Sequence, residues 1–153
     1  MPAIFMHASL RQLLLAVVVL GIVGLEVELA LLRHAESLEQ WIPHVALMIG
    51  LLSTLAVYVR PGLSSLRSFQ VVMSIFLVVG ALGVYLHFIG NVEFARERNP
   101  SLGGAALIWK ALRGATPALA PGALAQLALL GLLYTYRHPA LAAGSTQNSQ
   151  NVD

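Results

Sequence analysis

Residues 69–90, FQVVMSIFLVVGALGVYLHFIG, form an apolar run that contains no Asp, Glu, Lys or Arg. An α-helix rises about 1.5 Å per residue, so about 20 apolar residues cross a bilayer core about 30 Å thick. The run is long enough for this, and it lacks the alternation of apolar and polar residues that strands of membrane barrels show. It predicts a transmembrane helix.

Three further runs have the same character: 13–32, which starts LLLAVVVLGIVGL; 41–59, WIPHVALMIGLLSTLAVYV; and 118–136, ALAPGALAQLALLGLLYTY. Composition agrees, because 58% of the 153 residues are hydrophobic and only 10% are charged. Soluble domains carry about 25% charged residues. We therefore predict an all-α integral membrane protein, a four-transmembrane-helix bundle formed by a single domain over residues 1–141.

The segments between these runs differ in character. Residues 60–68, RPGLSSLRS, predict a tight turn, and Pro43 suits the first turn of the second helix. Residues 102–113 contain Trp109 and basic side chains, so we expect a short helix at the membrane interface. The polar residues 142–153 are expected to be disordered.

The orientation follows from short loops. Arg60 and Arg67 lie in the 60–68 turn, whereas the 33–40 loop contains only Arg33. Basic residues in short loops favour the cytoplasmic side, so we expect both termini in the cytoplasm of a bacterial-type inner membrane. Arg11 and the apolar residues after it resemble a signal peptide, but no A-x-A pattern follows, and we expect an uncleaved first helix.

Two stretches of the chain resemble each other. GIVGLEVELALLRH (21–34) aligns with GALGVYLHFIGNVE (80–93), and two runs end alike, as LAVYVRPGL (55–63) and LLYTYRHPAL (132–141). The similarity predicts two tandem helical hairpins related by a pseudo-twofold axis along the membrane normal. Small residues allow close helix packing in lipid, and the alignment offers four glycines for it: Gly21, Gly24, Gly80 and Gly83.

Ionisable residues inside the apolar runs are candidates for a functional site, because their insertion into a membrane is costly. Glu28 and His87 align in the repeat, so we expect them across the bundle centre. Glu26 is two residues from Glu28 and points elsewhere. It lies seven residues before Arg33, which predicts an ion pair between them.

A metal or haem site is one hypothesis for these groups. Imidazole and carboxylate ligands suit zinc, copper or iron, and two helical histidines, His44 and His87, could hold haem b. Neither Glu-x-x-His nor His-Glu-x-x-His occurs in the chain. The candidate ligands are Glu28, His34, Glu36, His44, His87 and Glu93.

The sequence lacks motifs that identify a reaction: Gly-x-Ser-x-Gly, a P-loop and a dinucleotide fingerprint are absent, and the chain has no cysteine. The nine Lys and Arg residues flank apolar runs, so a nucleic-acid partner is not expected. We therefore expect a non-catalytic structural or accessory subunit in the lipid bilayer, with a charged docking surface on the outward face. It would belong to a homo-oligomer or a larger membrane complex. The alternatives are the metal or haem protein and an oligomeric transporter of protons or small solutes.

Overall fold

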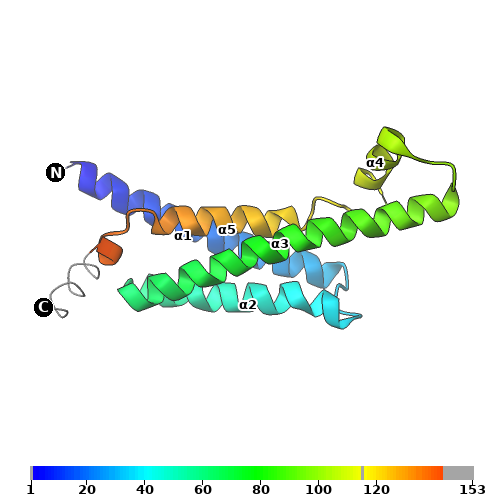
Figure 1. Ribbon diagram of the computed structural model, residues 1–153. Helices are drawn as coiled ribbons and strands as arrows, with labels where there is room; N and C mark the ends of the chain where they lie inside the picture. Colours follow the sequence, from blue (N-terminus) through cyan, green and yellow to red (C-terminus); the bar gives the residue numbers. More distant parts are fainter. Residues whose placement is uncertain (1, 115, 143–153) are drawn as a thin grey trace, which may run out of the picture. The chain divides into compact units, whose positions relative to one another are not determined.

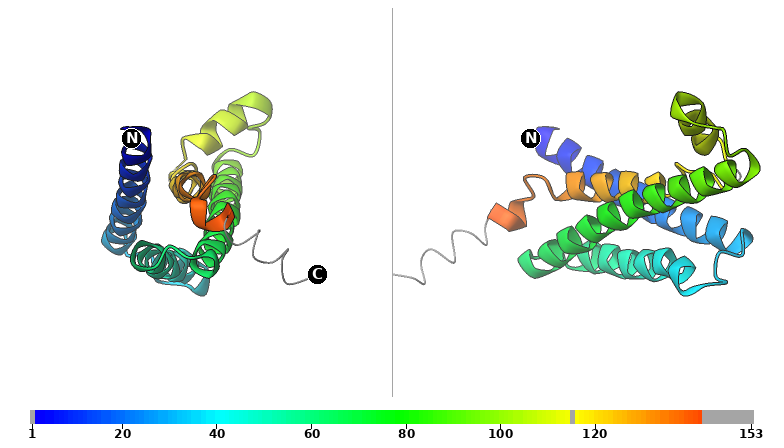
Figure 2. Two further views of the ribbon diagram at one scale, coloured as in Figure 1. Left: turned by 90° about the vertical axis from the view of Figure 1, so that its left-hand side faces the viewer. Right: turned by 45° about the vertical axis from the view of Figure 1, so that its right-hand side comes forward.

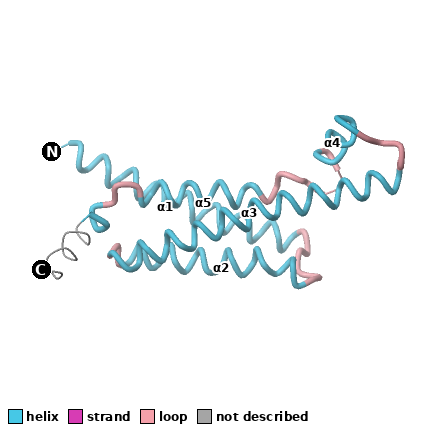
Figure 3. The backbone as a smooth tube through the Cα atoms, viewed as in Figure 1, coloured by secondary structure: helices cyan, strands magenta, loops and turns pink. Residues whose placement is uncertain are grey.

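The computed structural model describes residues 2–114 and 116–142, which form helices and connecting loops without a strand. Within this part the prediction of an all-helical chain is confirmed. The chain divides into a first compact unit, residues up to 76 together with those from 127 on, and a second unit, residues 77–126. The helices, shown in Figures 1 and 3, are α1, Pro2–Leu31; α2, Leu38–Val59; α3, Leu63–Arg98; α4, Gly104–Leu112; and α5, Gly122–Thr135.

Three helical segments are long and apolar enough to cross a membrane. Many of their large apolar side chains point outward, and Leu20 and Val78, for example, are 74% and 66% exposed. Apolar surface of this extent is rare on soluble proteins, whereas lipid tails cover it readily. These helices therefore indicate a membrane protein. The segments are Leu10–Leu31, Leu38–Val59 and Leu63–Arg98.

The fourth predicted span, 118–136, is α-helical only over α5. The 14 residues of α5 rise about 21 Å, less than the thickness of a bilayer core. Before α5 the chain runs through turns, in which the Ala120 amide donates to the Pro117 carbonyl at 3.1 Å, and in the first turn of α5 the Leu124 amide donates to the Pro121 carbonyl, also at 3.1 Å. The two prolines have no N–H and cannot continue α-helical bonding. The α-helix therefore begins later than hydropathy predicted.

The third helix is longer than predicted, and the turn before it is shorter. Only residues 60–62 separate α2 from α3, so the predicted turn over 60–68 is wrong in its second part. The Ser65 hydroxyl accepts a hydrogen bond from the Gly62 amide at 3.0 Å, which satisfies a free N–H at the helix start. At the other end α3 stops two residues before Pro100, because the residue preceding a proline disfavours the α conformation.

The second helix also begins earlier than predicted. The Ser37 hydroxyl accepts a hydrogen bond from the Gln40 amide at 3.4 Å, and the Gln40 side chain accepts one from the Glu36 amide at 2.7 Å. With Ser37 as the N-cap, α2 starts directly after it. Pro43 therefore lies inside the helix and not in its first turn as predicted, and the carbonyl four residues earlier loses its usual partner.

Glycines bring the helices of the first unit close together. A Cβ added at Gly50 of α2 would overlap the Phe76 ring of α3. One added at Gly131 of α5 would overlap the Met73 side chain of α3. The side chains of Phe76 and Met73 are fully buried. The core of this unit therefore lies where large residues of α3 pack against glycines of α2 and α5.

In the second unit, α4 folds back beside the C-terminal part of α3 (Figure 2). Asn91 of α3 is buried and donates hydrogen bonds to the carbonyls of Ala111, at 2.9 Å, and Thr116, at 2.7 Å. Its side-chain oxygen accepts a bond from the Thr116 hydroxyl at 2.8 Å. A buried amide is stable only when it is bonded in this way, so Asn91 attaches α4 and the residues after it to α3.

Candidate functional site

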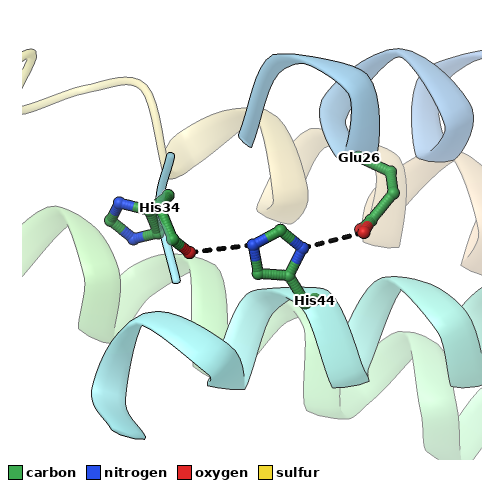
Figure 4. Close-up of polar contacts among 3 residues, drawn as sticks. All are labelled: Glu26, His34 and His44. Carbon is green, nitrogen blue, oxygen red and sulfur yellow. Dashed lines mark hydrogen bonds and ion pairs between the residues drawn. The ribbon is translucent and has the colours of Figure 1, made fainter. Parts of the chain in front are cut away.

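His44 is the centre of a polar cluster at the α1–α2 connection (Figure 4). Its Nδ1 atom lies 2.8 Å from Oε1 of Glu26, and its Nε2 atom lies 2.8 Å from the backbone carbonyl oxygen of His34. Glu26 belongs to α1, His44 to α2, and His34 to the loop between them. The cluster therefore joins both helices and their connection.

A tight turn at the end of α1 positions the His34 carbonyl. Arg33 adopts a left-handed conformation with φ of 52°. Its amide donates to the Ala30 carbonyl at 3.1 Å, and the His34 amide donates to the Leu29 carbonyl at 2.9 Å. These two bonds form a Schellman motif, which ends a helix and redirects the chain. The redirected carbonyl faces α2, where His44 donates to it.

The two contacts of His44 determine where its protons lie. A carbonyl oxygen can only accept a hydrogen bond, so Nε2 carries a proton. The 2.8 Å contact between Nδ1 and Glu26 then holds one further proton, on the imidazole as an ion pair or on the carboxyl as a neutral pair. Both forms have zero net charge. An apolar environment disfavours net charge, so it tolerates two ionisable groups best when their charges sum to zero.

The surroundings of the pair restrict water. The His44 side chain is 10% exposed, and that of Glu26 is 37% exposed. The Trp41 ring lies beside the imidazole, with centroids 5.4 Å apart. The second carboxyl oxygen of Glu26 is buried and has no hydrogen-bond partner. The pair is thus partly buried, with His44 well covered and Glu26 partly exposed.

Glu26 and Arg33 do not form the ion pair that was predicted from their spacing of seven residues. The ion pair recorded for Glu26 in the described part of the chain is with His44. The reason is local: Arg33 has left the helical conformation, so the spacing that puts residues on one helix face no longer applies to it.

The predicted ligands in the first unit take different positions. His44 and the backbone of His34 meet in the cluster, whereas the side chains of Glu28 and Glu36 are exposed. A metal or haem iron at His44 would have to replace one of its two hydrogen bonds. In the second unit His87 is half-buried and Glu93 is exposed. The pairing of Glu28 with His87 stays a prediction.

The four glycines of the predicted repeat have different neighbours. A Cβ at Gly21 would overlap Leu127 of α5, one at Gly80 would lie 2.7 Å from the Ala125 amide nitrogen, and one at Gly83 would lie 2.7 Å from the Pro121 Cβ. Gly24 has open space beside it. Three of the glycines therefore lie at close helix contacts, and the fourth does not.

Across residues 2–114 and 116–142, no three His, Asp or Glu side chains gather in a way that could hold a metal ion. Comparisons of the chain with protein-family models, with curated proteins and with solved structures give no match.

Proposed function

We propose that this chain is a non-catalytic integral membrane protein, a structural or accessory subunit whose charged α1–α2 end docks a partner protein. The observation that carries the proposal is Glu28, which is exposed although it lies in the apolar segment Leu10–Leu31. Placing an ionisable side chain in a membrane helix costs about 3 kcal/mol, and such side chains face protein or water rather than lipid tails. A partner protein would supply that environment.

The surface around Glu28 fits a docking role. Gly24, one turn earlier on α1, has open space beside it, which allows the close approach of a second helix. Charges of both signs lie at this end, and they provide specificity toward a partner of complementary charge. We call this the hairpin-tip surface; its exposed members are Glu28, Arg33, Glu36 and Glu39.

Contacts in the first unit support a four-helix bundle. α1 contacts α2 through Glu26 and His44. Gly50 brings α2 against α3, Gly131 brings α5 against α3, and Gly21 brings α1 against α5. Each helix thus contacts two others in a closed cycle, as in bundles of four.

In this proposal α5 provides the fourth span. Its α-helical part rises about 21 Å, and the four turn residues 118–121 add about 8 Å at the 3₁₀ rise. The sum is close to the bilayer core of about 30 Å. The Arg11 guanidinium donates to the carbonyls of Arg137 at 3.0 Å and Tyr136 at 3.4 Å, which supports the start of the first span and the end of α5 lying at the same membrane face.

The proposed orientation puts that face in the cytoplasm of a bacterial inner membrane. The short connection between α2 and α3 carries Arg60, and Arg67 follows one helical turn into α3; both are exposed. Basic residues in short loops favour the cytoplasmic side. The hairpin-tip surface would then face outward.

In vivo photo-crosslinking tests the docking proposal. A photoreactive amino acid at position 28 or 36 is expected to give one discrete adduct with a membrane protein, which can be a second copy of the chain. Position 52 is the control, because Leu52 is 60% exposed on α2 and lies outside the hairpin-tip surface. Adducts with lipid alone at positions 28 and 36, or equal protein adducts at position 52, would contradict the proposal.

The other sequence-based functions remain open to direct tests. Metal analysis and an absorption spectrum of protein purified after expression with metals and haem supply would reveal a metal or haem site. A Soret band that is lost in His87→Ala would support haem. Proton uptake by proteoliposomes would support the transporter. The tandem-hairpin arrangement is tested by an experimental structure in which residues 13–60 are superposed on 69–137.

A further inference from the structure

A cleft of about 740 Å³ lies between α4 and the C-terminal part of α3 in the second unit. Its polar lining consists of three basic side chains and two asparagine amides, and it includes no carboxylate. Two aromatic rings and several small or aliphatic residues complete the lining. The residues that define its character are Asn91, Phe94, Arg98, Trp109, Lys110 and Arg113.

Two helix faces form the walls of this cleft. On α3 the lining residues Asn91, Ala95 and Arg98 are spaced by four and three, and on α4 Ala106 and Lys110 are spaced by four. Residues at these spacings share one face of a helix. Because Asn91 binds the carbonyl of Ala111 directly, the two faces are held at a set separation. The cleft is thus a built feature of the second unit.

Two of the three cations of the cleft lie over aromatic rings. The Arg98 guanidinium lies 4.9 Å from the centroid of the Phe94 ring, and that of Arg113 lies 5.7 Å from the Trp109 ring. Such cation–π contacts order the guanidinium and leave its N–H groups available. A guanidinium offers a planar fork of donors that matches the oxygens of a phosphate group. Three cations in an apolar cleft therefore suit a phosphate that carries an apolar body.

The length of α3 puts this cleft at the level of the lipid headgroups. The apolar run ends at residue 90, and residues 91–98 continue the helix for about 12 Å. The headgroup layer on each side of a bilayer is about 5–7 Å thick. With the apolar run in the hydrocarbon core, Asn91 lies at the core boundary and Arg98 at or just beyond the headgroups. Trp109, which is exposed, is a residue type enriched at this boundary.

We propose that the α3–α4 cleft binds the headgroup of an anionic phospholipid. The lipid phosphate contacts Arg98, Lys110 and Arg113, and the glycerol and first acyl carbons contact Phe94 and Trp109. The occupant is a lipid and not a free phosphate, because the walls are largely apolar and the cleft opens at headgroup depth. The inference needs α3 to enter the membrane but needs no docking partner, so it and the docking proposal can fail separately.

Native mass spectrometry of the full chain in detergent tests this inference. The fraction of protein with one bound lipid is measured with phosphatidylglycerol and with phosphatidylcholine, and tighter binding of phosphatidylglycerol is expected. Each of Arg98→Gln, Lys110→Gln and Arg113→Gln is expected to weaken phosphatidylglycerol binding about fivefold. Arg96→Gln is the matched control, since Arg96 lies in the same last turn of α3 and is not part of the cleft lining.

A second variant separates the cleft from charge alone. Ala106 lines the cleft and is exposed, so Ala106→Trp puts a large ring into the cleft, keeps every cation and should leave the fold intact. It is expected to abolish tight phosphatidylglycerol binding. Equal binding of phosphatidylcholine, an equal loss in Arg96→Gln, or unchanged binding in Ala106→Trp would overturn the proposal. So would glycerol 1-phosphate binding as tightly as the lipid, which would identify a soluble phosphate ligand.

Discussion

Replacing Glu26 with Ala is expected to weaken the α1–α2 hairpin, because the Nδ1 atom of His44 loses its partner. His44 makes two hydrogen bonds of 2.8 Å, each of which contributes about 0.5–1.5 kcal/mol net. Water can reach Glu26 in part, so Glu26→Ala should lower the free energy of unfolding by about 1 kcal/mol. His44→Phe removes both bonds and should lower it by about 1–3 kcal/mol.

The double variant isolates the contact between the two side chains. In the absence of His44, Glu26 has no bond to lose, so Glu26→Ala/His44→Phe should be destabilised by less than the sum of the single variants. Hydrogen bonds between membrane helices give coupling energies of about 0.6–1.7 kcal/mol in such cycles. Glu26→Gln is the matched control, because the Gln amide can donate to a neutral Nδ1 and keep the bond.

The measurement is reversible unfolding in mixed micelles of a mild detergent and sodium dodecyl sulfate, followed by far-ultraviolet circular dichroism. The reasoning predicts the order wild type, Glu26→Gln, Glu26→Ala and His44→Phe from most to least stable. Single-variant losses that simply add in the double variant would show that the pair contributes nothing. Glu26→Gln as unstable as Glu26→Ala would show that a hydrogen bond from a neutral amide does not hold the contact, which contradicts the predicted order.

Three further predictions concern other contacts. Gly50→Ala should cost about 1–3 kcal/mol of stability because its Cβ overlaps Phe76, whereas Gly24→Ala, where the space is open, should be neutral or stabilising in the same unfolding assay. Arg11→Gln should cost about 1 kcal/mol, seen as faster hydrogen exchange in the last turn of α5, since the guanidinium caps that end. Burial and, secondarily, the positive charge of Arg11 lower the pKa of His138 below its ordinary value of 6.5. As the pH falls, His138 is therefore protonated in the unfolded chain before it is protonated in the folded one. The free energy of unfolding should decrease as the pH falls below 6.5, and His138→Gln should remove this decrease.

Hydropathy predicted the interior of the helices well and their ends poorly. The run 41–59 lies inside α2, because the length of an apolar segment is a local property of the sequence. The start of α2 depends on Ser37 and Gln40, and the start of α3 on Ser65. These residues are polar and favour a loop by composition, yet their side chains bond to the free amides of a helix start. Caps of this kind extend a helix beyond its apolar run.

The candidate site was only partly accessible from sequence for a different reason. His44 was chosen because its residue type binds protons and metals, but its partner depends on the turn conformation of Arg33. A helical spacing assigned Glu26 to Arg33, and that rule fails where the helix ends. The role of Asn91 was likewise missed, because its partners at positions 111 and 116 are distant in sequence. The cue was a polar amide at the end of an apolar run.

Glu26 and Glu28 show how a local turn determines which group can serve a partner. Two residues apart on a helix, they point in very different directions, so only one of them can meet α2. The Schellman turn at Arg33 brings His44 to Glu26 and leaves Glu28 exposed. Glu26 is thus paired inside the hairpin, and Glu28 is available for contacts outside it. The internal pair and the proposed docking surface are consequences of the same turn.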